Sequence, residues 1–184
     1  MNSVRMEDVR CTVEDIYALP EGQRAELIDG YMYMMAPPKR QHQRILINLA
    51  TEINNYIRRV SGNCEVVAAP FGVFLFNDDS NFVEPDISVI CDPSKLDEDG
   101  CHGAPDWVIE IISPSSRKMD CIIKLDRYRR AGVREYWIVD PKTETVRVCN
   151  FEKGENEERD YGFNDVVRVG IYADLEIDFK TITT

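Results

Sequence analysis

The chain has 184 residues, and its 22 Lys and Arg residues against 33 Asp and Glu residues give a formal charge of −11. This length suits a single domain, residues 1–184, with a hydrophobic core of its own. A hydrophobic fraction of 43% excludes a disordered chain, and the apolar runs fall far short of the ~20 residues that span a bilayer. The acidic excess argues against tight, indiscriminate binding to nucleic acid.

The N-terminal segment, Met1 to Glu14, has no apolar stretch of the kind found in signal peptides. We therefore expect a soluble, cytoplasmic protein that makes no contact with a membrane. The six cysteines form no CxxC pair and no spacing typical of a disulfide framework, so we expect mostly buried thiols in a reducing compartment. A zinc site formed by Cys91, Cys101 and His102 is set aside, because it lacks a fourth ligand.

Local patterns predict the first elements of the fold. The segment Thr12–Asp15 is typical of a capping box and predicts a short helix that ends before Pro20. The segment Arg24–Met35 predicts two strands around Asp29-Gly30, because this dipeptide is a strong hairpin signal. The segment Gln41–Val60 carries apolar residues at helical spacing, which predicts a long helix.

Short apolar runs between turn residues predict the remaining strands. Their ranges are Glu65–Ala69, Gly72–Phe76, Phe82–Cys91, Trp107–Ile112, Glu135–Val139 and Thr145–Phe151. A second helix is expected over Met119–Ala131, with Gly132 just past its end. The acidic segment 151–184 is expected to add one or two edge strands. This order of elements predicts an α/β or α+β domain around one mixed sheet flanked by helices.

Positive charge is concentrated in two segments. Lys39–Arg59 contains five basic residues and one acid, a net charge of +4, and Ser116–Arg134 contains seven basic residues and two acids, a net charge of +5. The rest of the chain therefore carries −20. Such zones on an acidic body could guide a phosphate-bearing partner to one place. The alternative is that they are two solvated helix faces.

Two acids stand within strands where a charge is costly. Asp86 opens a run of apolar and small residues, and Glu110 is the only charged residue of the strand Trp107–Ile112. A run this apolar indicates a strand buried on both faces, and a buried carboxylate must be paired, bind a metal or become neutral. If the two strands pair antiparallel, the two carboxylates come together and form a plausible site for Mg²⁺ or Mn²⁺.

The second helix adds a candidate cation. Asp120, Lys124 and Tyr128 follow one another at intervals of four residues, which places them on one helix face. Apolar neighbours flank that face, so Lys124 is a candidate to point toward the sheet. An ammonium group beside a metal-bound water and a phosphate stabilises the charge that develops in phosphoryl transfer. The alternative is a surface lysine that pairs with Asp120 on a solvated helix.

These residues belong to a longer ordered set of motifs. In chain order the set contains Glu26-Leu-Ile-Asp-Gly30, His42, Glu84-Pro-Asp86, Pro105-Asp-Trp-Val-Ile-Glu-Ile-Ile-Ser-Pro-Ser115, Asp120, Lys124, Tyr128 and Gly132-Val-Arg-Glu-Tyr-Trp-Ile-Val-Asp-Pro141. Over residues 12–150 this set resembles the Uma-two family of the PD-(D/E)xK restriction-endonuclease-like superfamily. The resemblance implies a metal-dependent phosphodiesterase fold with its site on a central hairpin.

The resemblance also implies roles for individual residues. Asp86 would be the aspartate of the motif and Glu110 its second acid, and both would bind Mg²⁺ together with the backbone carbonyl of Ile111. The superfamily's lysine is expected two residues after Glu110, where this chain has Ile112. The family carries the lysine on the following helix, and Lys124 matches that position.

Further residues are assigned by the same resemblance. Glu26 resembles the auxiliary acid that orients a water or assists a second metal, and His42, Ser113 and Tyr128 are candidates for contact with the substrate. Alternatives remain, because Glu26 could pair with a basic residue across the hairpin and His42 could be a structural histidine. The stretch Ser113-Pro-Ser-Ser116 could simply be a strand exit.

The sequence therefore predicts a Mg-dependent endonuclease that hydrolyses phosphodiester bonds of nucleic acid, with DNA as the first choice. A homodimer would suit the cutting of both strands of a duplex. The alternative is a catalytically inactive, nuclease-like binding module for nucleic acid or a protein partner, which the net acidic charge favours. Hydrolysis of a small phosphorylated molecule is a third reading, and it lacks a glycine-rich phosphate loop.

Overall fold

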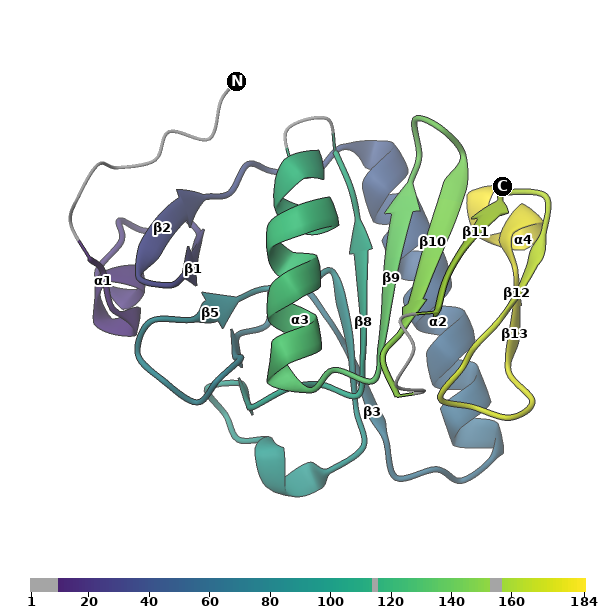
Figure 1. The fold of residues 1–184 in the computed structure, drawn as a ribbon, viewed down its shortest axis with the longest axis horizontal. Coiled ribbons are helices and arrows are strands. Elements are labelled where there is room, and N and C mark those ends of the chain that lie inside the picture. The colour runs from purple at the N-terminus through teal and green to yellow at the C-terminus, as the bar shows by residue number, and fades with distance from the viewer. Residues whose placement is uncertain (1–9, 114–115, 153–156) are drawn as a thin grey trace.

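The computed structural model describes residues 10–113, 116–152 and 157–184. The N-terminal segment considered above lies outside these ranges up to Val9, and so do Pro114 and Ser115 of the motif set. The fold is a mixture of helices and sheets, as predicted (Figure 1). Among the described helices, none is long and apolar enough to cross a bilayer.

The strands divide between two larger sheets, so the expectation of one sheet is wrong. The five-stranded sheet has the order β2-β1-β5-β4-β7 and the six-stranded sheet the order β11-β10-β9-β8-β6-β3. The first comprises β1 (Ala25–Ile28), β2 (Tyr31–Met34), β4 (Val73–Phe74), β5 (Phe82–Val83) and β7 (Cys101–His102). The second comprises β3 (Glu65–Ala68), β6 (Ile87–Ile90), β8 (Trp107–Ile111), β9 (Glu135–Asp140), β10 (Thr145–Asn150) and β11 (Glu157–Gly162). Only β8 and β9 run parallel within the six-stranded sheet, which makes it mixed.

The division occurs inside the predicted strand Phe82–Cys91. β5 ends at Val83 and pairs with the first sheet, whereas β6 begins at Ile87 and pairs with the second. The intervening Pro85 has no backbone N–H to donate to a ladder, which favours a break at this point. The break places Glu84 and Asp86 at the seam between the two sheets.

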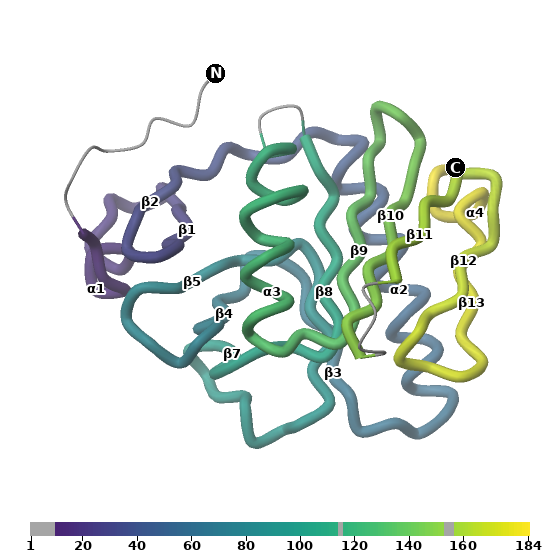
Figure 2. Tube along the Cα trace, in the orientation of Figure 1, coloured from purple at the N-terminus to yellow at the C-terminus, as the bar shows by residue number. Residues whose placement is uncertain are grey.

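The six-stranded sheet is covered on both faces (Figures 1 and 2). The helix α2 (Arg40–Arg59) packs on one face, where Trp107, Ile109 and Ile111 of β8 point. The other face carries Val108 of β8 and meets the helix α3 (Leu125–Ala131). All five residues of β8 are buried, which confirms the prediction of a strand covered on both sides.

The second predicted helix has two parts. Its first part, which we call η2 (Met119–Lys124), is a π-helical turn, and α3 continues from it without a break. Gly132 follows the end of α3 with φ of 97°, a left-handed conformation that favours glycine, as predicted. The helix at the N-terminus, α1 (Val13–Tyr17), begins with the predicted capping box at Thr12.

The C-terminal segment contributes to the core. β11 is the predicted edge strand beside β10. β12 (Val166–Arg168) and β13 (Glu176–Asp178) form a separate two-stranded sheet, and α4 (Phe179–Thr183) follows. Phe179 and Ile182 are buried in the same core as α2, and Asn48 of α2 donates a hydrogen bond to the Ile182 carbonyl at 2.8 Å.

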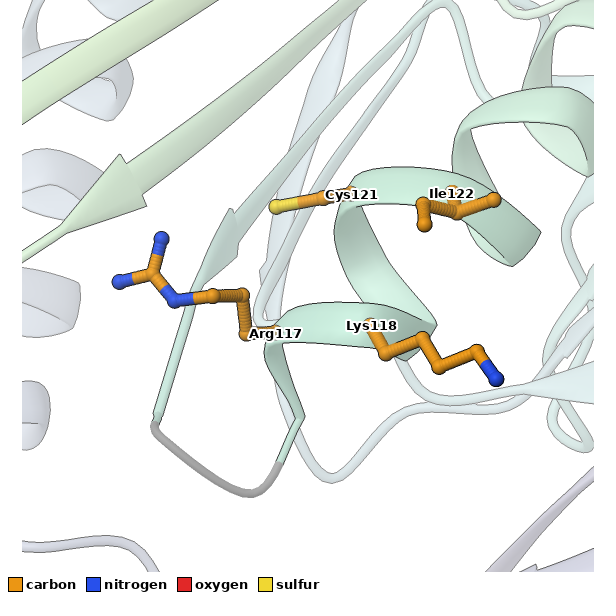
Figure 3. A pocket seen from close by; sticks show the side chains of 4 residues that line it. All are labelled: Arg117, Lys118, Cys121 and Ile122. Carbon is orange, nitrogen blue, oxygen red and sulfur yellow. The ribbon is translucent and has the colours of Figure 1, made fainter.

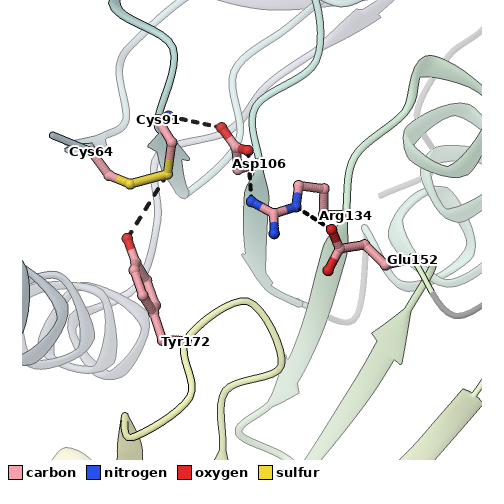
Figure 4. The surroundings of a disulfide bond; sticks show 6 residues. All are labelled: Cys64, Cys91, Asp106, Arg134, Glu152 and Tyr172. Carbon is pink, nitrogen blue, oxygen red and sulfur yellow. Dashed lines mark hydrogen bonds and ion pairs between the residues drawn. A yellow bond between two sulfur atoms is a disulfide. The ribbon is translucent and has the colours of Figure 1, made fainter. Parts of the chain in front are cut away.

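The cysteines differ from the expectation of thiols only. Cys64 and Cys91 form a disulfide bond (Figure 4). The pairing follows from the register, because Glu65 of β3 faces Ile90 of β6 and the two cysteines are the next residues along each strand. Cys91 is therefore not available for the zinc site that was set aside. Burial raises the pKa of the Cys101 thiol to about 11, and Cys101 lies fully buried, as predicted.

Candidate active site

The strands β6 and β8 bring the two predicted acids together. They pair antiparallel, with Ile87 opposite Ile109, so the register continued by one residue places Asp86 opposite Glu110. The carboxylate Oδ2 of Asp86 accepts a hydrogen bond from the backbone N–H of Ile111 at 2.7 Å. The antiparallel pairing that the sequence predicted is thus confirmed.

Lys124 points into the protein and not into solvent. Its Nζ lies 2.7 Å from Oε1 of Glu26, 2.8 Å from Oε1 of Glu110 and 3.6 Å from Oδ1 of Asp120. The residue is 3% exposed. The alternative of a surface lysine is therefore wrong, and Asp120 belongs to the same buried group.

The helix geometry explains the inward direction of Lys124. Within η2, Asp120 and Lys124 are buried, whereas Ile122 is 61% exposed. The face that carries the two polar residues thus turns toward the sheet, and an apolar residue faces solvent. This is the reverse of an ordinary amphipathic helix. The buried ion pairs of Lys124 compensate for the cost of burying its charge.

Glu26 of β1 enters the cluster from the five-stranded sheet. Its Oε1 accepts hydrogen bonds from Lys124 Nζ at 2.7 Å and from the backbone N–H of Glu84 at 2.9 Å. Burial raises the pKa of Glu26, although the ammonium of Lys124 lowers it. The expected alternative of pairing with a basic residue is correct in kind, but the partner comes from a helix and not from the hairpin.

Tyr128 of α3 contacts Glu110. Its hydroxyl donates a hydrogen bond to Oε1 of Glu110 at 2.7 Å, and the residue is 0% exposed. Burial and the charge of Glu110 hold the pKa of Tyr128 well above its usual range, so the phenol stays protonated. In this position the hydroxyl orients the carboxylate of Glu110.

His42 approaches from the first turn of α2. Its Nε2 lies 3.1 Å from Oδ2 of Asp86, and the side chains of both residues are about one-sixth exposed. Burial lowers the pKa of His42, but the hydrogen bond and the charge of Asp86 outweigh this effect and raise it. The buried Nδ1 of His42 has no hydrogen-bond partner among the described residues. His42 and Asp86 are thus the solvent-facing part of the site.

Ser113 follows β8 and contacts Ser116. Its backbone N–H donates to Oγ of Ser116 at 2.9 Å, and the two hydroxyls lie 3.3 Å apart. The hydroxyl of Ser116 in turn lowers the pKa of Asp120 against the larger effect of burial, which raises it to about 6. The contacts of Ser116 therefore connect the end of β8 to the buried cluster.

The cluster holds more negative than positive charge. Three acids (Glu26, Glu110 and Asp120) lie within 3.6 Å of one ammonium group, and Asp86 stands across the strand pair from Glu110. Burial raises the pKa of Glu110 to about 7, even though Lys124 lowers it. Lys124 itself stays charged, because the neighbouring carboxylates outweigh burial and hold its pKa well above its usual range. The uncompensated negative charge favours an additional cation.

Asp86 and Glu110 offer carboxylate oxygens, which are the donors that a hard divalent cation prefers. The described residues contain no group of three or more His, Cys, Asp or Glu side chains placed to hold a metal. Mg²⁺, however, is commonly bound through only one or two carboxylates and retains several waters. Asp86 and Glu110 supply such a pair, and the hydrogen bonds described above engage Oδ2 of Asp86 and Oε1 of Glu110.

Two features were missed in the sequence. Asp120 is part of the motif set and is expected on the same helix face as Lys124, but no role in the site is predicted for it, because the spacing of four residues suits a surface ion pair as well as a buried one. The ion pair between Arg24 and Glu84, which anchors the seam beside Glu26, was not predicted. It depends on the break between β5 and β6.

Comparisons with known proteins show the family and the fold of the chain. A family model named Uma2, described as "Putative restriction endonuclease", matches residues 13–180. An uncharacterized protein of Synechocystis is 30% identical over 98 residues, which cover 53% of this chain and 50% of that protein, so the match spans about half of the relative. A crystal structure from Anabaena variabilis, titled a putative nuclease belonging to DUF820, matches with a TM-score of 0.75 and 24% identity. The match covers 94% of this chain and 97% of the other, and it shows a shared fold.

Proposed function

Because the chain belongs to the Uma2 family, described as that of a restriction endonuclease, we propose that it is a metal-dependent endonuclease that cleaves the phosphodiester bonds of DNA. The family and the structural neighbour support a nuclease in general. The metal and the DNA substrate are our proposal. One observation carries it: the ammonium of Lys124 lies within hydrogen-bond distance of Glu110, across the strand pair from Asp86.

In this proposal Asp86, Glu110 and the backbone carbonyl of Ile111 hold Mg²⁺ or Mn²⁺. Such an ion polarises a phosphate oxygen and lowers the pKa of a bound water. The protein must fix the two carboxylates so that they present the correct oxygens. For Asp86 this is done by the Ile111 N–H and His42, and for Glu110 by Lys124 and Tyr128.

Lys124 acts as a fixed positive charge. Its pKa lies well above its usual range, so the side chain stays protonated at neutral pH and does not accept a proton as a base. In the resting site its single positive charge offsets part of the negative charge of Glu26 and Glu110. It also lies close enough to Glu110 to stabilise negative charge that develops on a phosphate bound beside Glu110. Ile112, which occupies the superfamily's lysine position, is 4% exposed and packs in the core.

Glu26 and Asp120 have supporting roles in this scheme. Both contact Lys124, and both are at most 5% exposed. They hold the ammonium in place, and Glu26 is also the acid best placed to orient a water within the seam. His42, with its exposed edge, is the residue that meets the substrate.

A second candidate is a nuclease-like module that binds nucleic acid without cleaving it. The position of Lys124 favours it, because the ammonium already satisfies part of the charge that a metal would otherwise neutralise. The two candidates differ in turnover and not in fold.

The test combines metal binding with cleavage. Calorimetry with Mg²⁺ and Mn²⁺ and nicking of supercoiled plasmid are measured on the wild type, on Glu110→Gln and on Asp86→Asn. We expect the wild type to bind the metal and nick the plasmid, and both variants to lose these properties. Metal binding that survives both substitutions would refute the site. Metal binding without cleavage of any DNA or RNA would favour the binding module.

A further inference from the structure

Several segments meet at the edge of the sheet where the site opens. β8 and β9 run parallel, with Ile111 opposite Val139, so their carboxyl ends lie at the same edge. The contact between His42 and Asp86 brings the start of α2 to this edge, and an ion pair between Arg117 and Asp140 brings the start of η2 there. Figure 1 shows the start of α2, the end of β8 and the turn after β9 along one side of the molecule.

This edge carries a group of exposed cations, which we call the cationic rim. Its members are Lys39, Arg40, Arg117, Lys118 and Lys142, all exposed. Within the described residues, only Arg117 of these five has an acidic partner, Asp140. Besides Asp140, which ends β9, this part of the edge contains one more acid, Glu144 in the turn after β9. The rim is thus a positive region on a chain whose net charge is −11.

The start of α2 is built against the usual preference of a helix. Lys39 is its N-cap residue and makes no side-chain cap, and the first turn contains no acid. The amino end of a helix carries a partial positive charge, so cations there are unfavourable and acids are favourable. The chain has 33 acids and places none in this turn. Helix stability therefore does not explain Lys39 and Arg40.

The start of η2 also carries exposed cations, and they lie beside an open pocket. Arg117, Lys118, Cys121 and Ile122 line a pocket of about 510 Å³ on the outer side of η2. Figure 3 shows Arg117 and Lys118 extending on two sides of this turn. Lys124 points from the same turn to the opposite side, into the buried acids.

We propose that the cationic rim binds the backbone phosphates of DNA on both sides of the phosphodiester that lies at Asp86 and Glu110. Lys39 and Arg40 hold one flank, and Arg117, Lys118 and Lys142 hold the other. The amino end of α2 faces the same edge and adds to the attraction of phosphate. This inference rests on the proposed nuclease function, because it assigns the path of that substrate across the site.

The rim also explains how a chain with a net charge of −11 can bind a negatively charged substrate. An acidic protein repels DNA over most of its surface, and a positive edge restricts attraction to one orientation. The contacts are to phosphates and carry no sequence preference. We therefore expect binding that depends strongly on salt and is limited to a few phosphates.

The experiment compares two double variants of one helix. Lys39→Gln with Arg40→Gln removes two charges at the start of α2, and Arg58→Gln with Arg59→Gln removes two charges at its end, far from the site. Binding of a short fluorescein-labelled DNA duplex is measured in EDTA over a range of salt concentrations. Each phosphate contact contributes about 0.9 to the slope of log K against log salt.

We expect the first double variant to lower the slope by about 2 and weaken binding, and the second to leave both unchanged. Lys118→Gln and Lys142→Gln are each expected to lower it by about 1. Melting temperatures show that each variant is folded. An unchanged slope in the first double variant would overturn the rim, even if the wild type cleaves DNA. Rim-dependent binding without cleavage by the wild type would keep the rim and overturn the nuclease.

Discussion

The two ends of the strand pair β6 and β8 carry the same dipeptide in the same geometry, yet they differ in chemistry. Asp86 stands one residue before β6, and Asp106 stands one residue before β8. Each follows a proline, and each accepts a backbone hydrogen bond from the end of the other strand: Asp86 from Ile111 at 2.7 Å and Asp106 from Cys91 at 2.8 Å. The antiparallel pair is thus nearly two-fold symmetric in these contacts.

The surroundings of the two aspartates break this symmetry. Asp106 accepts a hydrogen bond from the guanidinium of Arg134 at 3.1 Å, and Arg134 also binds Glu152, as Figure 4 shows. Asp86 has a histidine and, across the strand, the buried acid Glu110. A strand-end aspartate neutralised by arginine is a structural group. The same group beside a second buried acid is a candidate ligand, so the neighbours and not the dipeptide determine the role.

The largest effect is expected from Lys124→Met at the site end. Loss of the ammonium leaves Glu26, Glu110 and Asp120 buried without a cation, and breaking a buried pair in this way costs about 3–5 kcal/mol. Urea unfolding at neutral pH measures it. The matched change at the other end, Arg134→Met, removes a partly exposed cation and should cost about 1 kcal/mol or less. Equal losses would mean that the two ends are energetically alike.

The loss of unfolding free energy in Lys124→Met, which we call its deficit, should depend on pH in a defined direction. Burial already raises the pKa of Glu110 to about 7 and of Asp120 to about 6, so the folded state binds protons more strongly than the unfolded chain. A carboxyl group with a raised pKa in the folded state makes the folded state less stable as pH rises, and protonation of the group restores that stability. Because the ammonium of Lys124 lowers the pKa of Glu110 and of Asp120, its removal should raise both pKa values further. Unfolding in EDTA should therefore show a smaller deficit near pH ~5 than near pH ~8, and a deficit independent of pH would contradict the buried-acid account.

The second largest effect concerns Asp86→Asn. Loss of the charge at the proposed metal ligand should reduce plasmid nicking by about 10²–10³-fold, the range found when one electrostatic group is removed from an active site. The control is Asp106→Asn, which keeps the dipeptide position but lies at the other end and should retain nicking. If both variants nick equally well, the distinction between the two ends has no catalytic meaning.

The third effect is reduction of the disulfide bond near Asp106. Cys64 and Cys91 are 27 residues apart, and closing a loop of this length stabilises the folded state by about 3 kcal/mol in the chain-entropy model. Unfolding with and without dithiothreitol measures this, with Cys64→Ser plus Cys91→Ser as a control that no reductant should affect. Nicking at a temperature where the protein stays folded is expected to persist, because the bond lies at the far end from Asp86. Loss of nicking in reduced protein that is still folded would show that the disulfide end of the strand pair affects the site at the other end.

A smaller effect on stability is expected for Asp106→Asn. The amide oxygen can still accept the hydrogen bond from Cys91, but the charged interaction with Arg134 is lost. We expect a loss of about 1 kcal/mol, measured by thermal unfolding. A loss of nicking activity without a loss of stability would assign Asp106 to the site.

The smallest effect has the opposite sign. Lys39→Ser replaces a cation at the N-cap of α2 by a residue that caps, so the protein should gain about 1 kcal/mol. The same variant should bind DNA more weakly if the cationic rim is correct. Arg58→Ser at the other end of α2 removes a favourable cation and should lose stability. Stabilisation of neither variant, or of both, would contradict the account of the helix ends.

Local patterns predicted most of the secondary structure. The hairpin at Asp29-Gly30, the long helix α2 and Gly132 after α3 each depend on residues close together in the chain. What could not be predicted depends on pairing between distant segments. The division of the strand at Pro85 requires two sheets that compete for one segment, and the disulfide requires the register of β3 against β6.

The site was predictable to a similar degree. Antiparallel pairing of two strands is enough to bring Asp86 and Glu110 together. The burial of Lys124 was favoured by the family resemblance and not by the helix pattern, since its spacing to Asp120 also suits a surface ion pair. Burial of Asp120 follows from the π-helical turn, which has no distinctive pattern in the sequence.

The length of η2 is itself part of the site. A π turn closes each hydrogen bond over five residues and so contains one residue more than an α-helical turn would. Removing a single residue from Met119–Lys124, even the exposed Ile122, would take away this extra residue and let the segment close as an ordinary α-helix. Asp120 would then stand three residues before Lys124 instead of four, so its carboxylate would approach the ammonium from a different position while α3 kept its place. Residue count, and not only residue identity, therefore constrains how this helix can vary.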